Sequence, residues 1–123
     1  KVSDFDRAAP HGTGHIKAGL NYAMSLHAIV TAHEEGYAEN MYLDPATRTK
    51  VEETGGANFI FVTKDGKVVT PKSDSILQSH VVHLFMLLRN TLDLKLKKEK
   101  YYSMKLKTLL NVVFAVQLQL SHL

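Results

Sequence analysis

The sequence predicts an α/β fold in a single domain, because one long helical pattern is followed by several short β-type runs. Apolar side chains at Ile16, Leu20 and Met24 recur at helical spacing and predict a helix over residues 16–35. Residues 58–63, Asn-Phe-Ile-Phe-Val-Thr, form the strongest β run. A chain of 123 residues is long enough for one domain with a modest core.

Turn residues separate the expected elements. Gly36 is the expected end of the helix, because glycine adopts a positive φ at no steric cost. Short strands are expected at residues 40–43 and 51–54, on either side of a turn. The sequence Lys-Asp-Gly-Lys at 64–67 predicts a hairpin that joins the strand at 58–63 to a partner at 68–70.

The composition argues against metal and disulfide chemistry. The chain has no cysteine, so it has neither a disulfide framework nor a cysteine metal site. His11 and His15 have the spacing of a helical metal pair, but Gly12 and Gly14 break the helix that this spacing requires. We therefore expect no metal site.

Charge divides the chain into two parts. Residues 1–77 hold 8 Lys and Arg against 10 Asp and Glu, whereas residues 78–123 hold 7 against 2. The change predicts a boundary between Leu77 and Gln78. Beyond the boundary the chain is rich in leucine, which predicts helices over residues 76–94 and 104–120.

A single lysine follows a glycine-rich loop. Residues 12–14, Gly-Thr-Gly, break the chain, and Lys17 then stands at the start of the predicted helix. Loss of solvation at an apolar helix start favours the neutral amine, which is the form that attacks carbonyl groups. The alternative is an ordinary surface lysine whose stem lies along apolar neighbours.

The sequence segments around this lysine resemble those of a known family. Residues 4–26, DFDRAAPHGTGHIKAGLNYAMSL, and residues 42–77, with Glu-Thr-Gly-Gly-Ala-Asn at 53–58, are similar to branched-chain-amino-acid aminotransferases. These are class IV, fold-type IV enzymes that depend on pyridoxal 5'-phosphate. The resemblance covers residues 1–77 and implies part of the family's cofactor-holding C-terminal domain: a helix, short strands and a hairpin.

The resemblance implies a role for individual residues. Lys17 carries the cofactor as an internal aldimine and moves a proton between substrate and cofactor carbon atoms. Tyr22 contacts the ring oxygen of the cofactor, and Glu53 pairs with its ring nitrogen. The turn close to the ring and the substrate carboxylate is formed by Gly55, Gly56 and Ala57.

Each role has a simpler alternative. Without the resemblance, Glu52 and Glu53 read as solvated charges at a strand end, and Tyr22 as a half-buried helix residue. Adjacent strand residues face opposite ways, so one glutamate at most can face the cofactor. The match assigns Glu53 to the cofactor and predicts that Glu52 points outward.

Other properties of the parent enzyme also follow from the resemblance. It implies amino transfer between leucine, isoleucine or valine and 2-oxoglutarate, by a cytoplasmic homodimer. The chain's apolar runs are shorter than the roughly 20 residues of a membrane span, and we expect no nucleic-acid partner.

The sequence after Leu77 differs from the family, but a one-base shift of the reading frame restores family-like peptides. Possible codons for residues 79–83, read one base earlier, give Ile-Thr-Arg-Arg-Ser. Those for residues 111–123 give Glu-Cys-Gly-Leu-Cys-Gly-Thr-Ala-Ala-Val-Ile-Ser-Pro. Both peptides are similar to the family's phosphate-binding segments, so we infer a frameshift at about Leu77 and a mainly helical, out-of-frame tail at residues 78–123.

This inference limits what the chain can do. Without the phosphate-binding turns we expect weak or absent cofactor binding, and no transamination by this chain alone. The alternative is a small basic protein whose amphipathic helical tail, basic over residues 93–107, binds a membrane surface or a partner helix.

Overall fold

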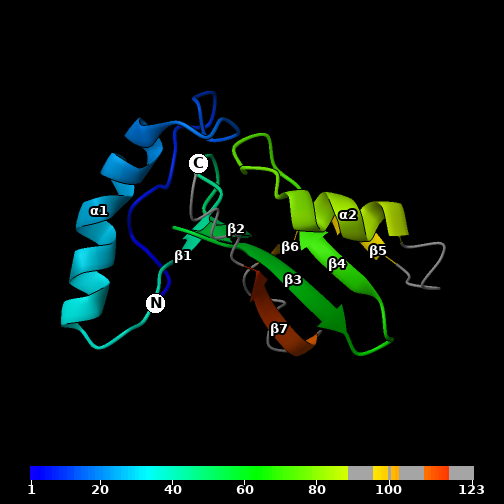
Figure 1. The fold of residues 1–123 in the computed structure, drawn as a ribbon. Helices are drawn as coiled ribbons and strands as arrows, with labels where there is room; N and C mark the ends of the chain where they lie inside the picture. Colours follow the sequence, from blue (N-terminus) through cyan, green and yellow to red (C-terminus); the bar gives the residue numbers. More distant parts are fainter. Residues whose placement is uncertain (89–95, 100, 103–109, 117–123) are drawn as a thin grey trace.

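A computed structural model of the chain describes residues 1–88, 96–99, 101–102 and 110–116. Two helices flank a sheet, with α1 on one side of the strands and α2 on the other (Figure 1). The elements in chain order are α1 (Gly19–Glu34), β1 (Met41–Leu43), β2 (Lys50–Thr54), β3 (Asn58–Thr63), β4 (Val68–Pro71), α2 (His80–Leu88), β5 (Leu96–Glu99), β6 (Tyr101–Tyr102) and β7 (Leu110–Val116).

Strands β1 to β4 form an antiparallel meander in chain order. The β3–β4 hairpin pairs Phe61 with Val69 and closes through Gly66, whose φ of 76° needs glycine. Strand β5 joins β4 in parallel, β6 pairs with β2, and β7 runs antiparallel along β3. The strands and the hairpin predicted for residues 40–70 are therefore confirmed.

Helix α1 is confirmed, and it begins at Gly19 rather than at residue 16. It ends as expected: Gly36 has φ of 85°, and its N–H donates to the carbonyl oxygen of His33 at 2.9 Å.

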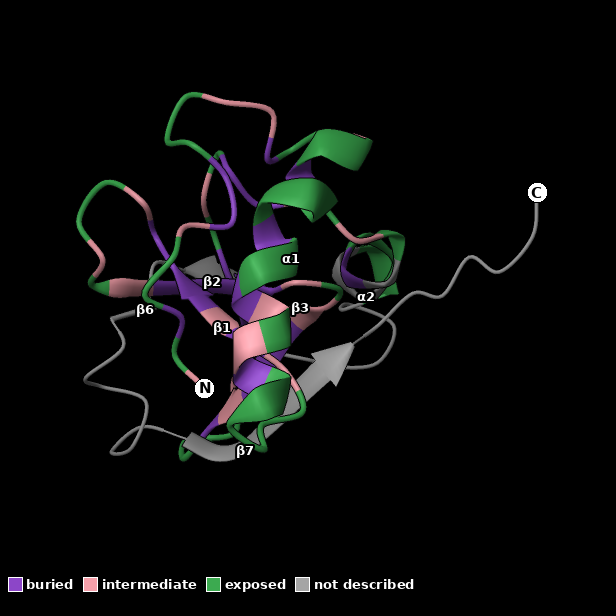
Figure 2. Ribbon diagram, turned by 90° about the vertical axis from the view of Figure 1, so that its left-hand side faces the viewer, coloured by how far each residue is buried: buried purple, intermediate pink, exposed green. Residues whose placement is uncertain are grey.

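The apolar residues whose spacing predicts helix α1 do not form its buried face. The helix buries small and polar residues, namely Asn21, Ser25, Ala28 and Ala32. Large apolar residues point outward instead, with Leu20 55% and Leu26 61% exposed, and Figure 2 shows the exposed surface along the helix. Spacing alone could not separate these faces, because apolar residues occur all around the helix. Within the described part of the chain, no helix is long and apolar enough to cross a membrane.

The hydrophobic core lies on the meander. Leu43, Val51, Phe59, Phe61 and Val69 form one buried cluster. The rings of Phe59 and Phe61 stack with their centroids 5.4 Å apart, as expected for residues two apart on one face of a strand. This packed sheet positions the residues of β2 described below.

The prediction of a mainly helical tail is wrong in the described residues. Helix α2 falls within the predicted range of 76–94, but Leu110–Val116 is a strand, not part of a helix over 104–120. This segment contains β-branched and aromatic residues, which favour strands, and it pairs with the full length of β3. The rest of the predicted second helix lies outside the described residues.

Candidate functional site

Glu53, on strand β2, holds a buried carboxylate with a fixed orientation. Its side chain is 5% exposed, and its Oε1 lies 2.8 Å from Nε of Arg7 in an ion pair. Oε1 also accepts a hydrogen bond from the backbone N–H of Leu77 at 3.0 Å, and Oε2 accepts one from Nδ2 of Asn58 at 2.9 Å. Three separate segments of the chain therefore hold this one carboxylate.

Burial raises the pKa of the Glu53 carboxyl to about 7, because the charged form loses its hydration. The Arg7 guanidinium opposes this effect and lowers the pKa, while the neighbouring Glu52 carboxylate raises it further. The negative charge is thus incompletely compensated by the protein, and a second positive group beside the carboxylate would stabilise its ionised form.

Arg7 connects the carboxylate to the glycine-rich loop. Its Nη2 donates to the carbonyl oxygen of Gly14 at 2.8 Å and to that of Ser75. A Cβ atom on Gly14 would overlap the Ser75 carbonyl oxygen and lie 2.8 Å from the Arg7 guanidinium. The second glycine of Gly-Thr-Gly is therefore required by close packing around Arg7.

Lys17 follows this loop and precedes α1, and it is exposed. The expected loss of solvation is wrong in this structure, because Ile16 and Leu20 are also exposed and form no apolar wall around the amine. The loop reaches the Glu53 cluster through the hydrogen bond from Arg7 to Gly14, three residues before Lys17. Tyr22 lies one turn into α1 and is 45% exposed.

The prediction that Glu52 points outward is also wrong. Glu52 is 3% exposed, and its Oε1 accepts hydrogen bonds from the hydroxyl groups of Ser73 at 2.5 Å and Ser75 at 2.6 Å. The two glutamates do have different partners, as strand alternation requires. Both are buried because the segment over residues 73–77 packs against β2 and donates to both carboxylates.

Gly55, Gly56 and Ala57 form the turn between β2 and β3. The hydroxyl oxygen of Thr54 accepts a hydrogen bond from the Ala57 N–H at 2.7 Å, and the Thr54 N–H donates to the Ala57 carbonyl at 2.9 Å. The three predicted substrate residues therefore lie together and begin two residues after Glu53 in the chain.

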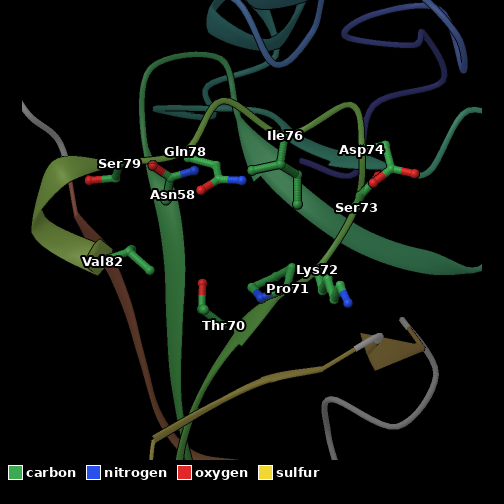
Figure 3. Close-up of a pocket in the computed structure, with 10 residues that line it drawn as sticks. All are labelled: Asn58, Thr70, Pro71, Lys72, Ser73, Asp74, Ile76, Gln78, Ser79 and Val82. Atoms are coloured by element: carbon green, nitrogen blue, oxygen red, sulfur yellow. The ribbon is translucent and has the colours of Figure 1, made fainter. Parts of the chain in front are cut away.

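A small cavity adjoins the Glu53 cluster (Figure 3). It has a volume of about 110 Å³ and lies where β3 and β4 meet the start of α2. Asn58 lines the cavity and also donates to Glu53, while Gln78 and Ser79 line it from the side of α2. The other lining residues are Thr70, Pro71, Lys72, Ser73, Asp74, Ile76 and Val82.

We compared the chain with family models, with curated proteins and with solved structures. No protein-family model matches the chain. The chain is 55% identical over 83 residues to a branched-chain-amino-acid aminotransferase of Haemophilus influenzae, covering 63% of this chain and 24% of the relative. It is 52% identical over 96 residues to the enzyme of the same name from Helicobacter pylori, covering 78% and 28%.

Solved structures similar to this chain include enzymes of the same name. The branched-chain amino acid aminotransferase of Escherichia coli matches with a TM-score of 0.81 at 30% identity, covering 94% of this chain and 38% of that one. The enzyme of Thermobaculum terrenum in its PLP form matches with a TM-score of 0.80 at 28% identity. The chain matches one segment of a branched-chain-amino-acid aminotransferase. It spans about a quarter of the length of these curated relatives.

The aminotransferase resemblance selected Glu53 as a site residue but did not select the residues that hold its carboxylate. Arg7 and Asn58 both stand within the quoted sequence segments, yet neither was chosen. A signal was present for Asn58, which follows Glu53 by five residues across a glycine turn and so lies opposite it in a hairpin. No comparable local signal links Arg7 to Glu53, because 46 residues separate them.

The described part of the chain shows no candidate metal centre. There, no three His, Cys, Asp or Glu side chains gather closely enough to hold an ion.

Proposed function

We propose that this chain carries the lysine and the ring-nitrogen carboxylate of a branched-chain transaminase site that uses pyridoxal 5'-phosphate. The parent reaction would move an amino group between leucine, isoleucine or valine and 2-oxoglutarate. One observation carries the proposal: Glu53 is buried, oriented from three sides and incompletely neutralised. The names of the relatives and the PLP form of a structural neighbour support it.

The residues around Glu53 suit the ring nitrogen of the cofactor. A protonated pyridine nitrogen would supply the second positive charge that the carboxylate needs, and the carboxylate would in turn keep that nitrogen protonated. When bound, the cofactor acts as an electron sink for the carbanion formed at the substrate.

The chain's own residues would divide the remaining tasks. Lys17 would hold the cofactor through its amine and then carry a proton. Tyr22 would donate a hydrogen bond to the ring oxygen. The turn at residues 55–57 would border the substrate carboxylate, because glycines leave the backbone accessible there.

We also propose that residues 1–77 are the family's partial domain and residues 78–123 an out-of-frame tail. The change in charge between residues 1–77 and 78–123 and the two family-like peptides in the shifted reading frame support this proposal. Determining the nucleotide sequence across codons 70–123 tests it. A frame that encodes Gln78 to Leu123 in every independent isolate of the gene would overturn it.

The homodimeric state and cytoplasmic location of the parent enzyme stay part of the proposal and rest on the resemblance alone. The alternative, a basic tail that binds a membrane surface or a partner helix, depends on residues 93–107, most of which lie outside the described residues. Binding to anionic liposomes that weakens with salt would favour this alternative.

Chemical labelling tests the assignment of Lys17. The chain is incubated with millimolar pyridoxal 5'-phosphate, reduced with borohydride and digested, and the modified peptides are identified by mass. The peptide containing Lys17 should carry most of the label, and Lys17→Ala should remove it without changing the labelling of Lys64. An even spread of label over Lys50, Lys64 and Lys67 would contradict the assignment.

A further inference from the structure

Asn21 reaches back from helix α1 to the loop that precedes Lys17. It is the third residue of the helix and is 4% exposed. Helical Cβ atoms are tilted toward the helix N-terminus, so a short polar side chain at this position can reach the segment before the helix. Here that segment is the glycine-rich loop.

The Asn21 carboxamide makes three hydrogen bonds with this loop. Its Nδ2 donates to the carbonyl oxygen of Thr13 at 2.8 Å and to that of Ile16 at 2.9 Å. Its Oδ1 accepts a hydrogen bond from the Thr13 hydroxyl at 3.0 Å. Both amide protons are therefore directed at the backbone on the N-terminal side of Lys17.

The loop has few other constraints near the lysine. Its backbone contributes short-range bonds, from the Ile16 N–H to Thr13 and from the Ala18 N–H to Ile16, each at 2.9 Å. The residue at the N-cap position of α1, Ala18, makes no side-chain capping bond. Asn21 thus links the loop to the helix where a capping side chain is lacking.

We propose that Asn21 is a positioning residue for Lys17. By holding the two carbonyl groups at positions 13 and 16, it fixes the backbone from which the Lys17 amine extends. Arg7 holds the same loop at Gly14 and also pairs with Glu53. This role deepens the proposed function and rests on it.

Substitution by aspartate gives a sharp test because the side chain keeps its size. In Asn21→Asp the two donated hydrogen bonds are lost, and a carboxylate faces two carbonyl oxygens. Ser25→Ala is the matched control: Ser25 is buried on the same face of α1, but its hydroxyl donates within the helix, to the Tyr22 carbonyl at 3.0 Å. Thr13→Val and Thr13→Ser remove and retain the third hydrogen bond.

Two measurements are needed. The first is amide hydrogen exchange at residues 14–18, with residues 59–61 of β3 as the reference for global opening. The second is the ratio of label on Lys17 to label on Lys64 after treatment with pyridoxal 5'-phosphate and borohydride. A purely structural role would accelerate exchange in β3 as well and would not change the ratio.

We expect Asn21→Asp to accelerate loop exchange and to lower the labelling ratio, each about tenfold. Thr13→Val should move both readouts in the same direction by a smaller factor, and Thr13→Ser should restore them. Ser25→Ala should change neither by more than about twofold. If Asn21→Asp prevents folding, the Thr13 pair decides, since Thr13 is partly exposed.

Two results would overturn the proposal: loop exchange in Asn21→Asp and Thr13→Val that matches Ser25→Ala, or a labelling ratio that stays constant. A different result would contradict the proposed function. Wild-type chain labelled away from Lys17 would contradict the cofactor assignment, while the exchange measurement would still report whether Asn21 holds the loop.

Discussion

Burial raises the pKa of Glu53 to about 7, against 4.5 for the ordinary carboxyl group. The folded state therefore binds a proton more tightly than the unfolded state, so this group stabilises the fold below pH 4.5 and loses that contribution as the pH rises to about 7. The expected change in the free energy of unfolding is on the order of 3 kcal/mol. Urea denaturation across this range checks it, because Glu53→Gln should lack this component of the pH dependence.

A glutamine variant whose stability curve runs parallel to that of the wild type would contradict this assignment. Glu52→Gln is the matched control. The Glu52 carboxylate is also buried, but it accepts hydrogen bonds from two serine hydroxyl groups and is not paired with Arg7.

Arg7 has a larger expected effect on stability. In Arg7→Met the Glu53 carboxylate loses its buried ion pair and two carbonyl oxygens lose their donor, which should cost about 3–5 kcal/mol. Arg48→Met removes an ion pair with Asp6, whose side chains are 37% and 41% exposed, and a hydrogen bond to the Ser3 carbonyl oxygen, and it should cost about 1–2 kcal/mol. Denaturant titration of both variants checks the difference, and equal costs would refute it.

At the scale of elements, alanine substitutions at Gly14 and Gly19 distinguish a glycine required by close packing from one that is not. Gly14→Ala should destabilise the chain by about 3 kcal/mol, because the added methyl group overlaps the Ser75 carbonyl oxygen. Gly19→Ala should be neutral or stabilise by up to about 1 kcal/mol, since nothing lies within 4 Å of its Cβ position and alanine favours helix. Thermal unfolding of the two variants measures this contrast, and a tolerated Gly14→Ala would argue against close packing there.

The meander could be predicted from sequence because its signals are local. The β run at residues 58–63 and the turn glycine at 66 lie within a few residues of the partners they determine. The buried face of α1 could not be predicted in this way, since the helix packs through Ala28 and Ala32 and leaves Leu26 outside. The buried positions of α1 hold small side chains, so the large apolar residues that set the helical spacing lie outside the core.

In the site, too, local sequence signals predict some features, while others depend on distant segments. Motif resemblance selected Glu53 as a candidate, but the burial of Glu52 and the contact of Arg7 depend on segments 21 to 46 residues away in the chain. The helical prediction for residues 104–120 failed at Leu110–Val116 because pairing with β3 favours a strand there, and a single-segment pattern does not include such a partner.

At the scale of the whole molecule, the chain holds about a quarter of the length of the curated aminotransferases it resembles. We expect no conversion of leucine to its keto acid above the rate of a Lys17→Ala control, because the proposed frameshift removes the family's phosphate-binding turns from this chain. A coupled assay for glutamate formation from leucine and 2-oxoglutarate measures this. Turnover that disappears in Lys17→Ala would show that the chain is sufficient for catalysis.

The order of strand pairing has a consequence for how the chain folds. Pairs within the meander join near neighbours, such as Glu53 with Asn58, whereas β7 pairs Val113 with Phe61 across about 50 residues. Closing a short loop costs less entropy than closing a long one, so the β3–β4 hairpin should form before β7 docks. Pulsed hydrogen exchange during refolding should therefore protect amides of β4 earlier than those of β7, and on a ribosome the meander could pair while the tail is still being synthesised.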